Sequence, residues 1–203
     1  MEFNVADLIE GAADAVPERE ALVAGEARRS FADLDQRANR IAHHLSGSGV
    51  AAGQHVGIYA YNCVEWVETL WAVFKIRAVW ININYRYVEE ELRYLFDNAD
   101  LKALVHAREF APRVRNVRDV MPLLRHTVVI EDDSGADLTG LDSVPYEEAV
   151  AAAVEMGAEA VGLEEIYDVD ADVFSPCALG AVVNENTIPR FKFKIVAGAA
   201  NNQ

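Results

Sequence analysis

The chain has little cysteine, a shortage of basic residues and no long apolar run. Its two cysteines, Cys63 and Cys177, lie far apart without Cys-x-x-Cys or Cys/His spacing, which excludes a disulfide framework and a zinc site and is typical of a reducing compartment. Lys and Arg number 18 against 33 Asp and Glu, and the net charge of −15 argues against nucleic acid or an anionic membrane as a partner. No apolar stretch reaches the ~20 residues that span a bilayer, and the N-terminus lacks the basic region of a signal peptide. We therefore expect a cytoplasmic protein that needs no nucleic acid and no membrane.

The first three quarters of the chain alternate between amphipathic helices and unbroken apolar strands. Strands are predicted at 55–60, 78–83, 102–107 and 126–131, and helices at 88–96, within 108–125 and from about Tyr146 to Met156. Two short strand-like runs, 21–23 and 29–31, flank a bend at Gly25. Apolar strands between amphipathic helices predict an α/β fold with a parallel sheet covered by helices on both faces.

Three further helices are predicted from their caps and apolar faces. Asn4, Ser30 and Asn62 are the expected N-caps, the last with Glu65 at the capping-box position, and Gly47 and Gly49 end the second helix. The expected buried faces are Val5, Leu8, Ile9 and Ala12; Leu34, Ala38, Ile41, Ala42 and Leu45; and Val64, Val67, Leu70, Trp71 and Phe74.

Three local patterns are interpreted as structural. Residues 47–52 fit the dinucleotide fingerprint GxGxxA, but the order is helix, glycines, strand, whereas a phosphate loop leaves a strand and enters a helix. His43 and His44 are expected to be a solvated pair on the polar side of a helix. Asp132, Asp133 and Asp137 lack the spacing of a calcium loop.

The segments YNCVEW, FKIRAVWININYRY and ELRYLF follow one another in an order and spacing that resemble the N-terminal subdomain of acyl-CoA synthetases, which are adenylate-forming enzymes. The resemblance covers residues 3–152, and Trp80 stands where that family more often has proline. It implies ATP-dependent (Mg²⁺-assisted) activation of a carboxylic acid, followed by transfer to CoA. The phosphate-cradling loop, the ribose-binding aspartate and the lysine of that family have no match in the sequence. No catalytic residue can therefore be carried onto this chain.

Residues 154–203, with SPCALG and AGAANNQ, resemble the NAD-binding domain of leucine, valine and phenylalanine dehydrogenases. The pattern predicts one Rossmann-like βαβ unit: a strand at 172–175, a short helix at 184–191 and a strand at 194–199. The resemblance implies that Cys177, Ala178, Leu179 and Gly180 line an NAD site, and that Asn201 and Asn202 reach the nicotinamide ribose or the substrate. The glycine-rich pyrophosphate turn and the catalytic domain of those enzymes have no match here.

The sequence thus predicts two units, a ligase-like subdomain at 1–152 and a dehydrogenase-like fragment at 153–203, neither with a complete set of catalytic motifs. One hypothesis is a ligase-like protein that is inactive alone; a second is a ligase component completed by another polypeptide; a third is an NAD-binding module used for sensing or assembly. Because both units leave sheet edges open, self-association or a complementing polypeptide is expected. The tail is predicted to dock on the N-terminal sheet as extra strands or as a flap.

Overall fold

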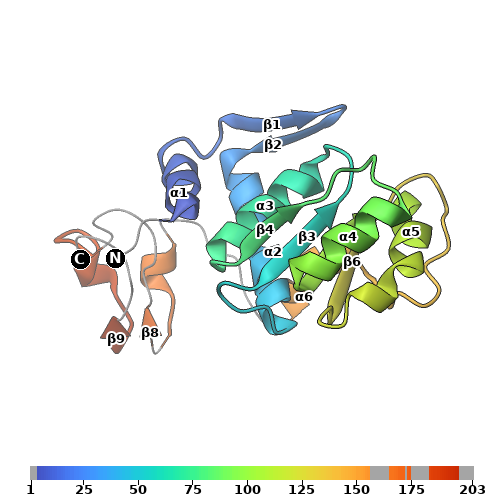
Figure 1. Ribbon diagram of the computed structural model, residues 1–203. Coiled ribbons are helices and arrows are strands. Elements are labelled where there is room, and N and C mark those ends of the chain that lie inside the picture. Colours follow the sequence, from blue (N-terminus) through green and yellow to red (C-terminus); the bar gives the residue numbers. More distant parts are fainter. Residues whose placement is uncertain (1–3, 156–164, 172, 175–182, 197–203) are drawn as a thin grey trace.

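The computed structural model describes residues 4–155, 165–171, 173–174 and 183–196. Its main feature is a five-stranded parallel sheet in the order β4-β3-β5-β6-β7 (Figure 1). The strands are β3 (His55–Tyr59), β4 (Val79–Asn82), β5 (Leu101–Ala107), β6 (His126–Ile130) and β7 (Val144–Pro145). The helices are α1 (Val5–Ala15), α2 (Phe31–Gly47), α3 (Val64–Lys75), α4 (Glu89–Ala99), α5 (Ala111–Asn116) and α6 (Tyr146–Glu155), with 3₁₀ turns η1 (Arg108–Phe110) and η2 (Arg118–Val120) around α5. The predicted α/β fold with a parallel sheet is confirmed.

The helices form two layers, one on each face of this sheet. α2 packs against α3 and α6, whereas α4 packs against α5. The chain passes from β3 to β4 in one direction and from β4 back across β3 to β5 in the other. Because crossovers between parallel strands are right-handed, this reversal puts α3 and α4 on opposite faces. Burial on both faces explains why Ile58, Leu104 and Val105 are fully buried in unbroken apolar strands.

Two smaller sheets accompany the large one. β1 (Glu20–Ala24) and β2 (Ala27–Ser30) form the antiparallel hairpin expected around Gly25, whose φ of +59° suits glycine at the turn. β8 (Val173–Phe174) and β9 (Ile195–Val196) pair in parallel, with the 3₁₀ turn η4 (Ile188–Arg190) between them. Within the described residues these strands bond to each other and not to the large sheet, so the prediction that the tail adds strands to that sheet is wrong for β8 and β9 (Figure 1). Docking of the tail as a flap stays a prediction.

The helix faces test the sequence patterns directly. All five residues predicted for the buried face of α2 are buried, and Ser30 caps that helix with Asp33 in a capping box. α1 begins at Asn4 as predicted, but Val5 and Leu8 of its expected face are 48% and 62% exposed. α3 departs further: its N-cap is Cys63, without a side-chain cap bond, rather than Asn62. The residues that α3 buries are Val64, Glu68, Thr69, Ala72 and Val73.

An ionic network explains the rotated face of α3. Glu68 is fully buried, and its Oε1 lies 2.7 Å from Nε of Arg37 and 3.2 Å from Nε of Arg29. Arg37 on α2 also donates to both carboxylate oxygens of Glu147 on α6. A buried carboxylate is stable only with such partners, so ion pairing as well as apolar burial determines the inner face of α3.

A second ionic contact fastens α1. Lys75, at the end of α3, has a side chain that is 7% exposed and pairs with Glu10 of α1 and Asp35 of α2. The Asn4 amide also donates to the carbonyl of Phe74 at 2.8 Å. α1 is therefore held by polar contacts, which agrees with the exposure of its apolar side chains.

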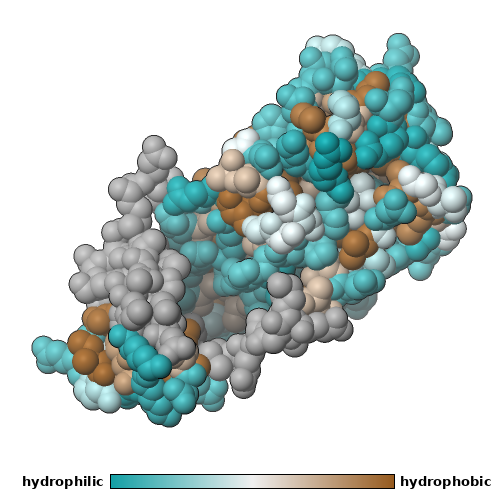
Figure 2. Space-filling model, turned by 90° about the horizontal axis from the view of Figure 1, so that it is seen from below, coloured by the Kyte–Doolittle hydropathy of each residue, from teal (hydrophilic) through white to brown (hydrophobic). Residues whose placement is uncertain are grey.

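The outer surface is largely hydrophilic, as the excess of acidic residues suggests. Figure 2 shows mainly hydrophilic residues on the described part of one face, with apolar residues in separate small patches. In the described part of the chain, every helix is too short or too polar to cross a membrane.

Candidate functional site

The carboxyl edge of the sheet between β3 and β5 is the place where the topology favours a ligand site. β3 and β5 are neighbours, and the helices that follow them, α3 and α5, lie on opposite faces. In open α/β sheets the crevice outside the strand ends at such a reversal is where ligands bind. Side chains that follow β3, β4 and β5 meet at this edge.

An aromatic cluster occupies this edge. Its members are Tyr59 at the end of β3, Tyr61 after it, Tyr85 and Tyr87 after β4, and Phe110 after β5. The ring of Tyr59 is fully buried and stacks on Phe110 with ring centroids 4.4 Å apart. Tyr61 lies over Tyr85 at 4.8 Å and over Phe110 at 5.2 Å. Tyr61 and Tyr85 remain 45% and 37% exposed, so the cluster presents an accessible aromatic surface above a buried base.

Arg113 of α5 ties the cluster together. Its Nη1 lies 3.1 Å from the Tyr59 hydroxyl and donates to the carbonyls of Tyr87 at 3.1 Å and Tyr85 at 3.4 Å. The Tyr59 hydroxyl donates in turn to the Tyr87 carbonyl at 2.6 Å. Burial raises the pKa of the Tyr59 phenol above its ordinary value, so the hydroxyl stays protonated at neutral pH and remains a donor. The loop after β4 is thereby fixed against β3 and α5.

Arg113 forms no salt bridge with a carboxylate in the described residues, although Glu89 is near enough to interact with its charge. Two other arginines after β5 have acidic partners in the loop before β7: Arg108 pairs with Glu131, and Arg115 with Asp137. Arg113 has hydrogen bonds only to neutral oxygens, and only its Nη1 makes them. Its guanidinium lies 5.5 Å from the ring centroid of Phe110. A half-buried guanidinium beside exposed rings can hold an anionic group next to a planar one, which is the chemistry of a nucleotide.

The predicted site residues are not among those that form this cluster. Cys177, Ala178, Leu179, Gly180, Asn201 and Asn202 all lie outside the described residues. The glycines of residues 47–52 follow α2 and precede β3, as expected for a connecting loop. The Tyr61, Tyr85 and Arg113 cluster was missed by sequence reasoning. The available signal was the aromatic and basic residues directly after predicted strand ends.

The two histidines of α2 behave differently from each other. His43 is exposed, but His44 is half-buried and its Nε2 lies 2.8 Å from Nε2 of His126, so the predicted solvated pair is wrong. Burial lowers the pKa of both partners, that of His126 to about 4. Within the described ranges no group of three or more potential ligands could hold a metal ion.

Cys63 is the free thiol among the described residues and the N-cap residue of α3. Burial, together with the nearby Glu65 carboxylate, raises its pKa to about 12. A thiol reacts as the thiolate, so these surroundings disfavour a nucleophilic role.

Comparison with known proteins identifies the main unit. A sequence model described as "AMP-binding enzyme" matches residues 9–170. The chain belongs to this family of AMP-binding enzymes. It is 49% identical over 151 residues to the 3-oxocholest-4-en-26-oate–CoA ligase of Rhodococcus rhodochrous, a match that covers 74% of this chain and 27% of the ligase. The chain thus spans about a quarter of the length of the curated ligases that it matches.

A solved structure and one further relative complete the comparison. An anthranilate CoA ligase in complex with anthranoyl-AMP matches with a TM-score of 0.68 and 24% identity, over 74% of this chain and 28% of that one, which shows the shared fold. The leucine dehydrogenase of Thermoactinomyces intermedius is 52% identical over 71 residues, which are 35% of this chain and 19% of that enzyme. The acyl-CoA ligase-like unit is therefore established, and part of the chain also resembles a leucine dehydrogenase.

Proposed function

We propose that this chain supplies the N-terminal part of an ATP-dependent acyl-CoA ligase for large apolar carboxylic acids. The observation that carries the proposal is the 49% identity to a 3-oxocholest-4-en-26-oate–CoA ligase, with further relatives described as medium/long-chain-fatty-acid–CoA ligases. In that reaction the acid and ATP give an acyl-adenylate and pyrophosphate, and CoA then displaces AMP. Because its sequence contains no phosphate-cradling loop of that family, we expect no adenylate formation by this chain alone.

The aromatic cluster and Arg113 would face a nucleotide substrate of this reaction. Tyr61 and Tyr85 offer exposed rings for stacking, and Arg113 offers the N–H groups that its contacts with Tyr59, Tyr85 and Tyr87 leave unused. A charge-assisted hydrogen bond to a phosphate contributes about 1.5–3 kcal/mol, which is enough to change a KM measurably.

A chimera tests the proposal. The 151 aligned residues of the Rhodococcus rhodochrous ligase are replaced by the matching residues of this chain, and acyl-CoA formation is measured with 3-oxocholest-4-en-26-oate and with a long-chain fatty acid. The chimera is expected to keep kcat/KM within about tenfold of the intact ligase, since the replaced unit has the same fold and site chemistry. A folded chimera without activity on either acid would refute the proposal.

Within the chimera, Arg113→Ala is expected to raise the KM for ATP or for CoA by about ten- to a hundredfold with a smaller change in kcat. Arg115→Ala is the matched control, because Arg115 is already paired with Asp137. An equal effect of both variants on KM would mean that Arg113 stabilises the carboxyl edge of the sheet and does not bind the substrate.

A second candidate function concerns the C-terminal segment. Its support is the 52% identity to a leucine dehydrogenase, and the residues involved would be Cys177–Gly180 with Asn201 and Asn202. Under this alternative the segment binds NAD and acts in sensing or assembly rather than in oxidative deamination. Calorimetric titration of the whole chain with NAD and with ATP separates the alternatives. Heat of binding with NAD but not with ATP supports this second function. If neither ligand binds, the proposal of a ligase component that is inactive alone is retained.

A further inference from the structure

β4 ends the large sheet, and one side of its backbone is open. The amides of Val79 and Ile83 donate toward β3, to the carbonyls of Gln54 at 2.8 Å and Ile58 at 2.9 Å. Backbone groups alternate in direction along a strand, so the N–H and C=O of Trp80 and Asn82 point away from the sheet. No strand in the described part of the chain pairs with that side.

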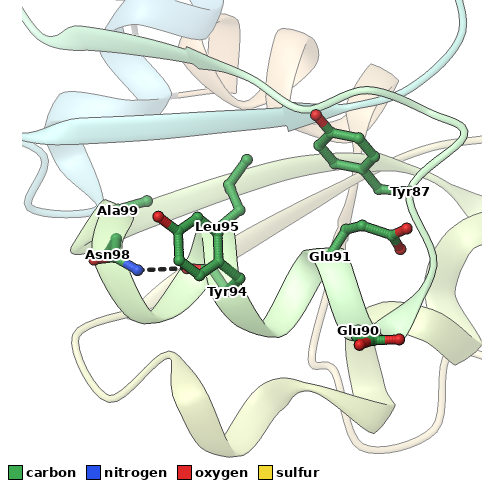
Figure 3. Close-up of a pocket in the computed structure, with 7 residues that line it drawn as sticks. All are labelled: Tyr87, Glu90, Glu91, Tyr94, Leu95, Asn98 and Ala99. Atoms are coloured by element: carbon green, nitrogen blue, oxygen red, sulfur yellow. Dashed lines mark hydrogen bonds between the residues drawn. The ribbon is translucent and has the colours of Figure 1, made fainter.

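A groove runs along α4 next to this edge. It encloses about 660 Å³ and is lined by Tyr87, Tyr94 and Leu95 together with Glu90 and Glu91 (Figure 3). In Figure 3 the Leu95 side chain points from α4 toward the sheet. Tyr94 is 78% exposed, so its ring forms an accessible wall of the groove.

The groove and the open strand lie on the same side of the molecule. α5 and η2 flank the opposite side of α4, where Arg93 pairs with Asp119. In the order β4-β3-β5-β6, the free side of α4 is therefore the side toward β4. Trp80 packs edge-on against Trp66 of α3, so its neighbours Val79 and Ile81 face the α4 layer. Val79 is 40% exposed there.

We propose that β4 and the groove along α4 bind an extended segment of another polypeptide, with alternating apolar and basic residues, as an added strand. Main-chain bonds to Trp80 and Asn82 would hold the segment. Because side chains alternate between the two faces of a strand, its basic side chains would lie on the face of Val79 and Tyr94, and its apolar side chains would pack beside Trp80 on the other face. The acidic rim selects basic residues: Glu90 has no ion pair within the described ranges, and the chain carries a net charge of −15.

A second copy of the chain is the less favourable occupant of this edge. Pairing of two β4 strands about a twofold axis would join two copies that each carry a net charge of −15. Charge of one sign on both copies opposes their association. A lysine-bearing segment is instead attracted to the acidic rim of the groove.

Amide hydrogen exchange, followed by NMR on the whole chain, tests the proposal. The probe is the capped peptide Lys-Val-Lys-Val-Lys-Val, and Glu-Val-Glu-Val-Glu-Val is its matched control. The lysine peptide is expected to slow exchange at Trp80 and Asn82 without a comparable change at Val79, which is already bonded to β3. The glutamate peptide should bind about three- to tenfold more weakly, and Glu90→Lys should remove that preference. Asp97→Lys, an exposed change on α4 away from the groove, should keep it.

Three results would overturn the proposal. The first is unchanged exchange at Trp80 and Asn82 with saturating lysine peptide. The second is protection that rises with protein concentration in the absence of peptide, which would assign the edge to a second copy. The third is equal binding of the two peptides. Because neither peptide takes part in ligation, each outcome is independent of the ligase proposal.

Discussion

Glu68→Gln is the substitution that should reveal how strongly the buried ion network holds the helical layer. The carboxylate is fully buried and contacts Arg37 at 2.7 Å and Arg29 at 3.2 Å. Glutamine keeps the size of the side chain but loses the charge. Two guanidinium groups, with side chains 15% and 26% exposed, then each lose an anionic partner.

The expected loss is about 3 kcal/mol of unfolding free energy. Removing one partner of a buried ion pair costs about 3–5 kcal/mol. The lower end applies because Arg37 keeps Glu147 and Arg29 is partly solvated. For a chain of this size, about 3 kcal/mol corresponds to a fall in Tm of roughly 6–12 °C.

Urea unfolding followed by far-ultraviolet circular dichroism gives the measurement, with Glu147→Gln as the matched control. Glu147 binds the same Arg37 but its side chain is 67% exposed, so its loss should cost about 1 kcal/mol or less. If Glu68→Gln unfolds within about 1 kcal/mol of the control, the burial of Glu68 does not position α3 and the reasoning is wrong.

Three further predictions follow from single contacts. The pKa of His126 is about 4, below its unfolded value, so the fold favours the neutral imidazole. The stability that depends on this neutral form should be lost as pH falls from about 6.5 to about 4. In His126→Gln the fall in unfolding free energy over that pH range, measured with urea, should be smaller by about 1–2 kcal/mol after allowance for solvent screening. Gly57→Ala should destabilise by about 1–3 kcal/mol in urea, because its Cβ would lie 3.0 Å from methyl groups of Ile83, Leu101 and Leu104. Gly47→Ala, at an open position in α2, should instead be neutral or stabilise by up to about 1 kcal/mol. A Gly57→Ala midpoint equal to that of Gly47→Ala would contradict the packing argument.

The sequence predicted the structure best where apolar spacing alone determines which residues are buried. The buried face of α2 was predicted residue by residue, because its apolar side chains recur at helical spacing and Ser30 with Asp33 fixes the start. Four of the five strands of the large sheet were predicted for a similar reason, since burial on both faces demands unbroken apolar runs, whereas the two-residue strand β7 was not predicted.

The predictions of burial fail where the position of a side chain depends on a partner that is distant in the sequence. The inner face of α3 contains Glu68 and Thr69, whose partners Arg37 and Tyr146 lie 31 and 77 residues away. His44 was expected in solvent because its partner His126 is 82 residues away in the chain. No periodicity encodes such pairings. The same limit concealed the site, since Tyr61, Tyr85 and Arg113 become neighbours only when three strands end at one edge.

The distribution of ion pairs now distinguishes structural arginines from the functional candidate. Arg37, Arg108 and Arg115 each contact at least one carboxylate, and those pairs join elements that are distant in sequence. Arg113 has only neutral oxygen partners in the described part of the chain, although it lies at the edge where the topology favours a ligand. A paired arginine already has its counter-charge, so its replacement changes stability and leaves affinity for an anion unaffected. Arg113 retains the capacity to bind a phosphate, so its replacement should change a KM, and this difference can be measured in one protein.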